Sequence, residues 1–251
     1  GWPFVDALAE GLMAEAEGQP EALAAMTVLL PTRRAGRSLR EAFLRLSGGR
    51  PMLLPRMMPL GDMEDEDLLI GGWETGLGSS DEELYLPPPI PGLRRQMLLA
   101  RLVMARPDNA ATPEQAMFLA QELARLLDQV HTERRDFAAL QDLVPEAFAE
   151  HWQITLDFLK LVTELWPGLL QAEGALDPAD RRNRLLEARN RLWLNAPPGN
   201  PVIAAGSTGS IPATADLLAT VARLPQGAVV LPGLDRGASI ETWNHLASSH
   251  P

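Results

Sequence analysis

The chain has 251 residues, 46% of them hydrophobic, which is enough for a substantial core in one large domain or in one domain with an insertion. Its net charge of −11 does not indicate nucleic acid by bulk charge, although a local basic patch still could. The absence of cysteine excludes a disulfide scaffold, a thiol nucleophile and an iron–sulfur cluster within this sequence, and fits a reducing cytoplasm. No apolar run is long enough to cross a bilayer. Because the sequence begins with Gly1 and not with Met, we expect a piece of a longer protein.

The first sixty residues alternate between helical and strand patterns. Residues 3–17 have the apolar spacing of a helix, and residues 27–31, TVLLP, are short and aliphatic enough for a fully buried strand. Residues 33–47 again have helical spacing, with an apolar stripe along one face. Residues 51–60, PMLLPRMMPL, contain prolines that restrict them to an extended or edge-strand conformation.

The next segment, residues 61–91, combines a run of acids with a linker rich in glycine, serine and proline. The acids are Asp62, Glu64, Asp65, Glu66 and Asp67. Adjacent acids on a helix point in different directions, so we expect them to favour a helix N-terminus and not to hold a metal ion. The four histidines also lack the spacing of a metal site.

Residues 93–194 show almost continuous helical periodicity, which predicts four or five helices. Thr112 and Asp177 each precede a proline, a pattern typical of a capping residue followed by the first helical position.

The last part of the chain returns to a strand–helix–strand pattern. Residues 202–206 and 227–233 have the composition of buried strands, and a helical pattern lies between them. This order predicts a βαβ unit and therefore a parallel sheet. We expect an α/β domain formed by residues 1–90 and 198–251, interrupted by a helical insertion at residues 91–197.

A basic segment follows the first predicted strand. Seven arginines and a single acid, Glu41, lie between Pro31 and Arg56, although the chain as a whole is acidic. Ligands of α/β proteins bind at the carboxyl edge of the sheet, and a helix N-terminus with arginines suits phosphate. Arg33, Arg34 and Arg37 are therefore candidate backbone-binding residues. The alternative is a solvated basic face.

A second candidate is the small polar turn after the strand at residues 202–206. Its residues are Gly206, Ser207, Thr208, Gly209 and Ser210. Backbone N–H groups in such a turn can surround an anion, but the turn lacks the full G-x-G-x-x-G spacing of a dinucleotide site. The alternative is a tight turn that needs glycine for positive φ.

An intact P-loop is excluded by the lysine content. Lys160 is the only lysine among the 22 lysine and arginine residues, and it is followed by leucine. The motif G-x-x-x-x-G-K-[ST] therefore does not occur, so no catalytic residue for ATP hydrolysis is expected.

Several long segments, in the same order, resemble the N-terminal part of the AddB family of alphaproteobacterial type. They are TVLLPTRRAGRSLREAFLRL (27–46), LLPRMMPLGDMEDEDLL (53–69), PPPIPGLRRQMLLARLV (87–103), VIAAGSTGSIPATADLLATVARLPQGAVVLPGLD (202–235) and WNHLASSHP (243–251). AddB proteins are subunits of AddAB helicase–nucleases, which process DNA double-strand breaks. The resemblance covers nearly all of this chain and about the first quarter of such a protein.

The resemblance implies a degenerate superfamily 1 helicase domain, that is, a RecA-like parallel sheet with a large all-helical insertion. GWPFVDAL stands where an active relative has Gly-Lys-Thr, which implies a non-ATPase part of the subunit. LPTRRAG corresponds to a segment that holds the backbone of a single strand, and AAGSTGSIPAT to one that lies close to DNA. Arg33, Arg34, Arg37, Ser207 and Thr208 are thus the expected DNA-backbone residues, and Gly206, Gly209 and Ser210 the anion-binding turn.

The resemblance also implies partners and cofactors. The expected partners are single- or double-stranded DNA and an AddA-type helicase–nuclease subunit, with no membrane, and the family's inactive helicase half is associated with recognition of the Chi sequence. The family's iron–sulfur cluster and divalent metal belong to a C-terminal nuclease domain, so neither a cofactor nor a metal is expected in this chain. Two alternatives stay open: a nucleotide- or phosphometabolite-binding α/β domain that uses the Gly-Ser-Thr-Gly turn, and a structural module that docks a partner subunit.

Overall fold

The computed structural model describes residues 3–60, 86–105, 112–135, 161–233 and 239–245, together with Gly237. The acidic run from Asp62 to Asp67, most of the predicted linker and the helical patterns near residues 136–160 lie outside these ranges.

The chain divides into two compact units, which are described separately below. The first consists of Gly1–Pro59, Asn200–Thr208 and Gln226–Pro251. The second consists of Leu60–Gly199 and Gly209–Pro225, so the helix between the last two strands is grouped with the helical unit and not with the sheet.

The first unit contains a sheet of four parallel strands in the order β2–β1–β3–β4. The strands are β1 (Thr27–Leu30), β2 (Arg56–Pro59), β3 (Val202–Ala205) and β4 (Gly227–Val230). This confirms the predicted α/β class with a parallel sheet. The proline-containing strand β2 lies at the edge of the sheet, where a missing N–H does not interrupt a ladder on both sides.

The pairing of β1 with β3 joins segments that are far apart in the sequence. In the register, Thr27 is opposite Val202 and Leu29 is opposite Ala204. Because the two strands run in the same direction, they both end at the same edge of the sheet. The segments that follow β1 and β3 therefore leave the sheet side by side.

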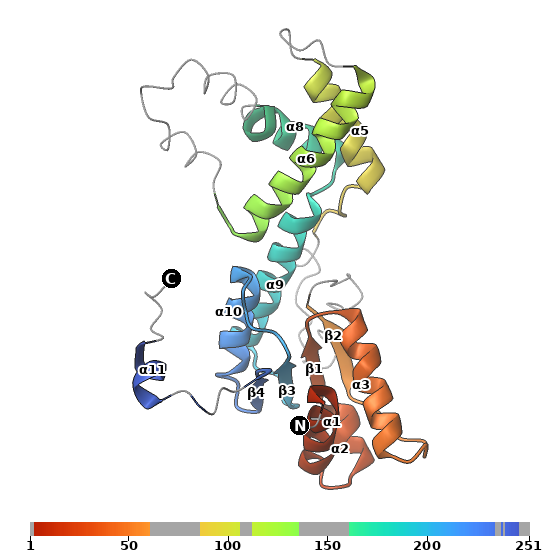
Figure 1. The fold of residues 1–251 in the computed structure, drawn as a ribbon, viewed down its shortest axis with the longest axis vertical. Coiled ribbons are helices and arrows are strands. Elements are labelled where there is room, and N and C mark those ends of the chain that lie inside the picture. Colours follow the sequence, from red (N-terminus) through yellow and green to blue (C-terminus); the bar gives the residue numbers. More distant parts are fainter. Residues whose placement is uncertain are drawn as a thin grey trace. The chain divides into compact units, whose positions relative to one another are not determined.

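Helices α1 (Phe4–Glu15) and α3 (Arg33–Leu46) pack against each other in this unit, and the short helix α2 (Pro20–Ala25) lies between α1 and β1 in the sequence (Figure 1). Alternate strand side chains join the helices in one apolar core, as the period of two requires. Its buried members include Leu8, Ala9, Leu12, Val28, Leu30, Leu39, Ala42, Phe43, Ile203 and Ala205. The core face of α3 is the predicted apolar stripe, so its arginines lie on the opposite face. A last helix, α11 (Ile240–His245), follows β4.

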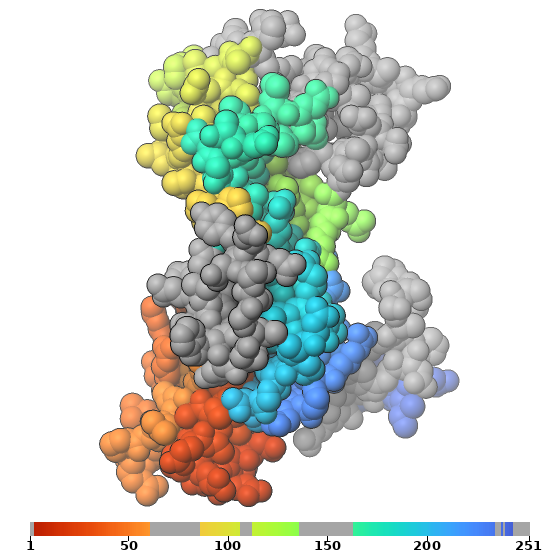
Figure 2. All heavy atoms as spheres, turned by 180° about the vertical axis from the view of Figure 1, so that it is seen from behind, coloured from red at the N-terminus to blue at the C-terminus, as the bar shows by residue number. Residues whose placement is uncertain are grey.

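The second unit is helical. Its elements are α5 (Gly92–Met104), α6 (Pro113–Thr132), the π-helical turn η3 (Leu161–Leu165), α8 (Trp166–Glu173), α9 (Pro178–Asn195) and α10 (Pro212–Val221). Helix α6 packs against both α5 and α9, and α10 lies along α9 (Figures 1 and 2). Within the described ranges, no helix is both long and apolar enough to span a bilayer.

The start of α6 agrees with the sequence pattern in detail. The Thr112 side chain accepts a hydrogen bond from the backbone N–H of Gln115 at 3.3 Å, and the Gln115 side chain accepts one from the Thr112 N–H at 3.0 Å. This reciprocal capping box satisfies two amide groups that the first turn leaves without helical partners.

Replacement of a core residue of α3 tests the assignment of its faces. Phe43 is fully buried, so Phe43→Ala removes a large ring from a packed core and should lower the free energy of unfolding by about 3–5 kcal/mol. Leu44, on the same helix, is 59% exposed, and Leu44→Ala should change the free energy of unfolding little. Urea denaturation of both variants measures the difference, and equal losses would contradict the assignment.

Candidate nucleic-acid interface

The junction between β1 and α3 places the predicted arginines. Strand β1 ends at Leu30, and Thr32 is the N-cap of α3 in an extended backbone conformation. The Thr32 hydroxyl accepts a hydrogen bond from the N–H of Ala35 at 3.2 Å, which fixes the start of the helix directly after the strand. Arg33 is thus the first helical residue at the carboxyl edge of the sheet.

The arginines of α3 form an exposed stripe. Arg33, Arg37 and Arg40 are spaced at i, i+4 and i+7, which puts them on one face of the helix, and Arg34 lies on a flank of that face. All four side chains are exposed, while the opposite face of the helix is in the core. The helix has no acid in its first turn, so no carboxylate of that turn offsets their charge.

The turn after β3 lies against the end of β1. Gly206 has a φ of +79°, and a Cβ atom at this position would lie 3.3 Å from Cε1 of Phe4 and 3.7 Å from Cδ of Pro31. Glycine is therefore required both for the backbone conformation and for the close approach. The result is that Ser207 and Thr208, which follow Gly206, leave the sheet next to the segment that leads into Arg33.

The predicted anion-binding turn loses one of its donors in this arrangement. The backbone N–H of Gly206 donates to the carbonyl oxygen of Val230 at 2.9 Å, which continues the pairing of β3 with β4. This N–H is consequently already paired. Of the side chains in the turn, Thr208 and Ser210 are exposed and Ser207 is half-buried.

Gly209 and Ser210 belong to the second unit and are described with it. Gly209 has a φ of +70°, and a Cβ atom there would lie 3.2 Å from Cδ1 of Leu218 and 3.4 Å from Cα of Ala215. Glycine at this position is thus explained by its positive φ, which is the alternative that the sequence left open, and also by close packing against α10.

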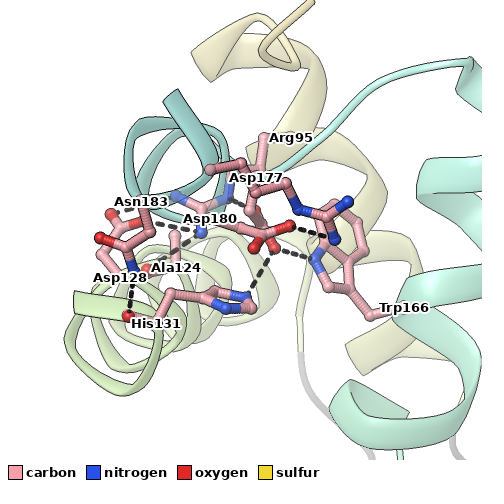
Figure 3. A network of polar contacts seen from close by, with 9 residues as sticks. Arg95, Ala124, Asp128, His131, Trp166, Asp177, Asp180 and Asn183 are labelled. Carbon is pink, nitrogen blue, oxygen red and sulfur yellow. Dashed lines mark hydrogen bonds and ion pairs between the residues drawn. The ribbon is translucent and has the colours of Figure 1, made fainter. Parts of the chain in front are cut away.

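A buried polar network in the second unit was not predicted (Figure 3). Its centre is Asp177, which is 1% exposed and stands at the N-cap position of α9. Its carboxylate accepts a hydrogen bond from Nε1 of Trp166 at 2.8 Å and lies 2.7 Å from Nε of Arg95 and 3.4 Å from Nε2 of His131. The predicted start of a helix at Asp177, with Pro178 as its first residue, is confirmed, but the carboxylate makes these contacts and caps no N–H of α9.

The Arg95 guanidinium extends this network from α5 to α6. Its terminal nitrogens lie 3.0 and 3.1 Å from the two carboxylate oxygens of Asp128, and one of them donates to the carbonyl oxygen of Ala124 at 3.3 Å. Arg95 is 5% exposed, so these contacts compensate for the removal of its charge from water. The network therefore connects α5, α6, α8 and the start of α9.

The pKa of Asp177 reflects these contacts. Burial alone would raise it, because a low-polarity environment disfavours the charged carboxylate. The hydrogen bond from His131, the positive charge of Arg95 and the indole N–H of Trp166 outweigh burial, so the pKa lies below its ordinary value. Asp177 is thus ionised in the folded protein at neutral pH.

Two hollows adjoin this network in the second unit. One has a volume of about 560 Å³ and is lined mainly by apolar side chains, with Asp177 and His131 among its polar members. The other has a volume of about 500 Å³ and is lined by arginines from the end of α6 and from α9. Among the described residues there is no group of acids and histidines that could hold a metal ion.

Comparison of the chain with models of known protein families, and with curated proteins, gave no match.

Substitution of Gly206 tests the close approach of the two strand exits. In Gly206→Ala, the added methyl group meets the Phe4 ring in a backbone conformation that alanine disfavours, and the free energy of unfolding should fall by about 1–2 kcal/mol or more. Gly48 also has positive φ, but no atom lies within 4 Å of its Cβ position, so Gly48→Ala reports the backbone cost alone. An equal loss in both variants, measured by urea denaturation, would show that the contact is absent.

Substitution of Asp177 tests the buried ion pair. Asp177→Asn leaves the Arg95 Nε buried without its carboxylate, so the free energy of unfolding at neutral pH should fall by about 3 kcal/mol. A carboxylate with a lowered pKa stabilises the fold above its unfolded pKa of about 3.9, and this contribution is lost as pH falls through the folded pKa. The gap between wild type and variant should therefore shrink below about pH 4. Glu173→Gln, which removes an exposed partner of Arg94, should have a smaller effect, and a gap independent of pH would overturn the assignment.

Proposed function

We propose that the chain holds the backbone of a DNA strand as a helicase-like part, without ATPase activity, of an AddB-type subunit of a helicase–nuclease that acts in double-strand break repair. The observation that carries the proposal is the adjacency of two strand exits at one edge of a parallel sheet. Gly206 lies against Pro31, so the turn Gly206–Thr208 and the start of the arginine-bearing helix α3 share that edge.

The chemistry of this edge suits a sugar–phosphate chain. Arg33, Arg34 and Arg37 are exposed and can donate charge-assisted, bidentate hydrogen bonds to phosphate oxygens. Thr208, in the turn after β3, offers an exposed hydroxyl. Contacts of this kind position a strand without reading its bases. We therefore assign backbone binding to this edge, and contribution to Chi recognition to the subunit as a whole.

The finer features of the proposal follow from the resemblance of the sequence to AddB. They are a RecA-like character of the sheet, a helical insertion within it, an AddA-type partner subunit and a cytoplasmic location. The parallel order β2–β1–β3–β4 supports the first of these, because a RecA-like domain also has a parallel sheet covered by helices. The sequence contains no intact P-loop, which supports a role in strand binding without ATP hydrolysis.

A second candidate function is docking of the partner subunit. Leu93, Met97 and Met104 are 68%, 50% and 48% exposed at i, i+4 and i+11 on α5, which is an apolar stripe on the second unit. The two functions are compatible, since the stripe and the arginines of α3 belong to different units. The remaining alternative, an anion or nucleotide held by the Gly-Ser-Thr-Gly turn, is weakened because the Gly206 N–H is already paired.

Salt-dependent binding of single-stranded DNA tests the proposal. The double variant Arg33→Ala, Arg34→Ala should weaken binding of an oligothymidylate and should also flatten the plot of log K against log salt, by about 0.7 for each phosphate that the variant no longer neutralises. Fluorescence anisotropy at several salt concentrations measures both quantities.

The matched control is the double variant Arg50→Ala, Arg223→Ala, which removes the same charge from exposed positions outside the proposed edge. It should lower affinity only slightly and leave the slope unchanged. If both double variants behave alike, or if neither changes the affinity or the slope, the assignment of DNA binding to the start of α3 is refuted.

A further inference from the structure

The two hollows of the second unit adjoin each other, because His131, Asp180 and Arg184 line both of them. The larger hollow is lined mainly by apolar side chains, which include Leu127, Trp166, Pro167, Leu170 and Leu176. Its volume of about 560 Å³ lies within the usual range for small-molecule sites. The smaller hollow continues the same surface with a polar, positively charged lining.

Surplus positive charge remains in the smaller hollow after its internal ion pairs are formed. Four arginines and two carboxylates line it. Arg184 pairs with Asp180 at 3.0 Å, and Arg134 pairs with Glu187 at 2.9 Å. Both carboxylates are thereby neutralised. Arg135 and Arg191, which are exposed, form no ion pair with any residue that the structure describes, so they carry the surplus.

The end of α6 holds its two arginines in a defined geometry. Arg134 has a φ of +50°, a left-handed conformation that glycine usually occupies at the end of a helix. Its N–H donates to the carbonyl oxygen of His131 at 3.0 Å, and the N–H of Arg135 donates to that of Val130 at 3.0 Å. The Arg134 side chain is further held between Glu187 and Asp216, at 2.9 and 2.6 Å. A non-glycine residue in this conformation is strained, and the two ion pairs of its side chain help to hold it there.

Asn183 lines the same hollow and is held in place by a hydrogen bond. The residue is 6% exposed, and its Nδ2 donates to the carbonyl oxygen of His131 at 2.5 Å, which fixes the orientation of the amide (Figure 3). Its Oδ1 has no hydrogen-bond partner among the described residues, although Asn183 lines the hollow. This oxygen has almost no accessible surface, so the ligand contacts of the hollow are assigned to its arginines.

We propose that these adjoining hollows bind a nucleoside phosphate. The phosphate would be held by Arg135 and Arg191, since guanidinium groups bind phosphate oxygens in a bidentate manner. The flat base, whose faces are apolar, enters the larger hollow. Such a nucleotide has two possible sources, a free mononucleotide or one nucleotide of a strand, and the chemistry of the site is the same for both.

Calorimetric titration of the full chain tests the proposal, with deoxynucleoside 5′-monophosphates, the corresponding deoxynucleosides, inorganic phosphate and an oligothymidylate as probes. Monophosphates should bind more tightly than both deoxynucleosides and phosphate. The double variant Arg135→Ala, Arg191→Ala changes exposed residues and should weaken monophosphate binding about tenfold or more. Arg101→Ala, Arg223→Ala removes the same charge from exposed positions elsewhere and should leave it unchanged.

The outcomes separate this proposal from the function assigned to α3. Monophosphate binding that is weakened about tenfold or more in the Arg135, Arg191 variant but kept in the Arg33, Arg34 variant supports the site. If the Arg135, Arg191 variant also fails to bind oligothymidylate, the natural ligand is one nucleotide of a strand. If the variant still binds oligothymidylate, the natural ligand is a free nucleotide. Absence of monophosphate binding, or equal binding of inorganic phosphate and monophosphate, overturns the proposal. The proposal is also overturned if the Arg101, Arg223 control variant weakens monophosphate binding as much as the Arg135, Arg191 variant does, whatever the result for α3.

Discussion

The parallel pairing of β1 with β3 is the constraint on which the proposed interface depends. The two strands come from distant parts of the chain, and only their common direction brings the segments that follow them to one edge of the sheet. Gly206 then allows the turn after β3 to lie against Pro31, since any side chain there would meet the Phe4 ring. The turn after β3 and the segment that leads into α3 thus adjoin because of backbone geometry.

A different constraint organises the second unit. The Asp177 carboxylate makes no helix-capping hydrogen bond, which would contribute about 1 kcal/mol. Instead it accepts a hydrogen bond from Trp166 and contacts Arg95 and His131. Burial of a carboxylate and a guanidinium is costly, and three partners for each are needed to compensate for the lost hydration. The network therefore tolerates one arrangement of α5, α6, α8 and α9 far better than others. The same arrangement fixes His131, which lines both hollows.

Local features of this fold could be predicted from the sequence, and long-range ones could not. The bounds of α3 and the starts of α6 and α9 were predicted to within about a residue, because apolar spacing and the residues before proline are encoded within each segment. The strands were predicted because short aliphatic runs between proline and glycine have few other conformations.

The missed features depend on residues that meet only after folding. Asp177 before a proline is the pattern of a cap, and nothing near it in the sequence indicates Arg95 or His131. Arg134 stands where a helix usually ends in glycine, so its left-handed conformation has no local signal. The paired N–H of Gly206 depends in the same way on Val230. Turn glycines that bind a ligand and those that serve packing look alike until such partners are known.

The almost exclusive use of arginine has physical consequences for the buried network of the second unit and for both proposed sites. Arg95 contacts Asp177, Asp128 and Ala124 at once through three nitrogens in one plane, which a single ammonium group could not do with the same geometry. The chain as a whole carries a charge of −11, so its net charge gives no general attraction for a polyanion. Binding at either site must then come from short-range, directional contacts of guanidinium groups with phosphate, which favour a correctly placed strand or nucleotide over non-specific association.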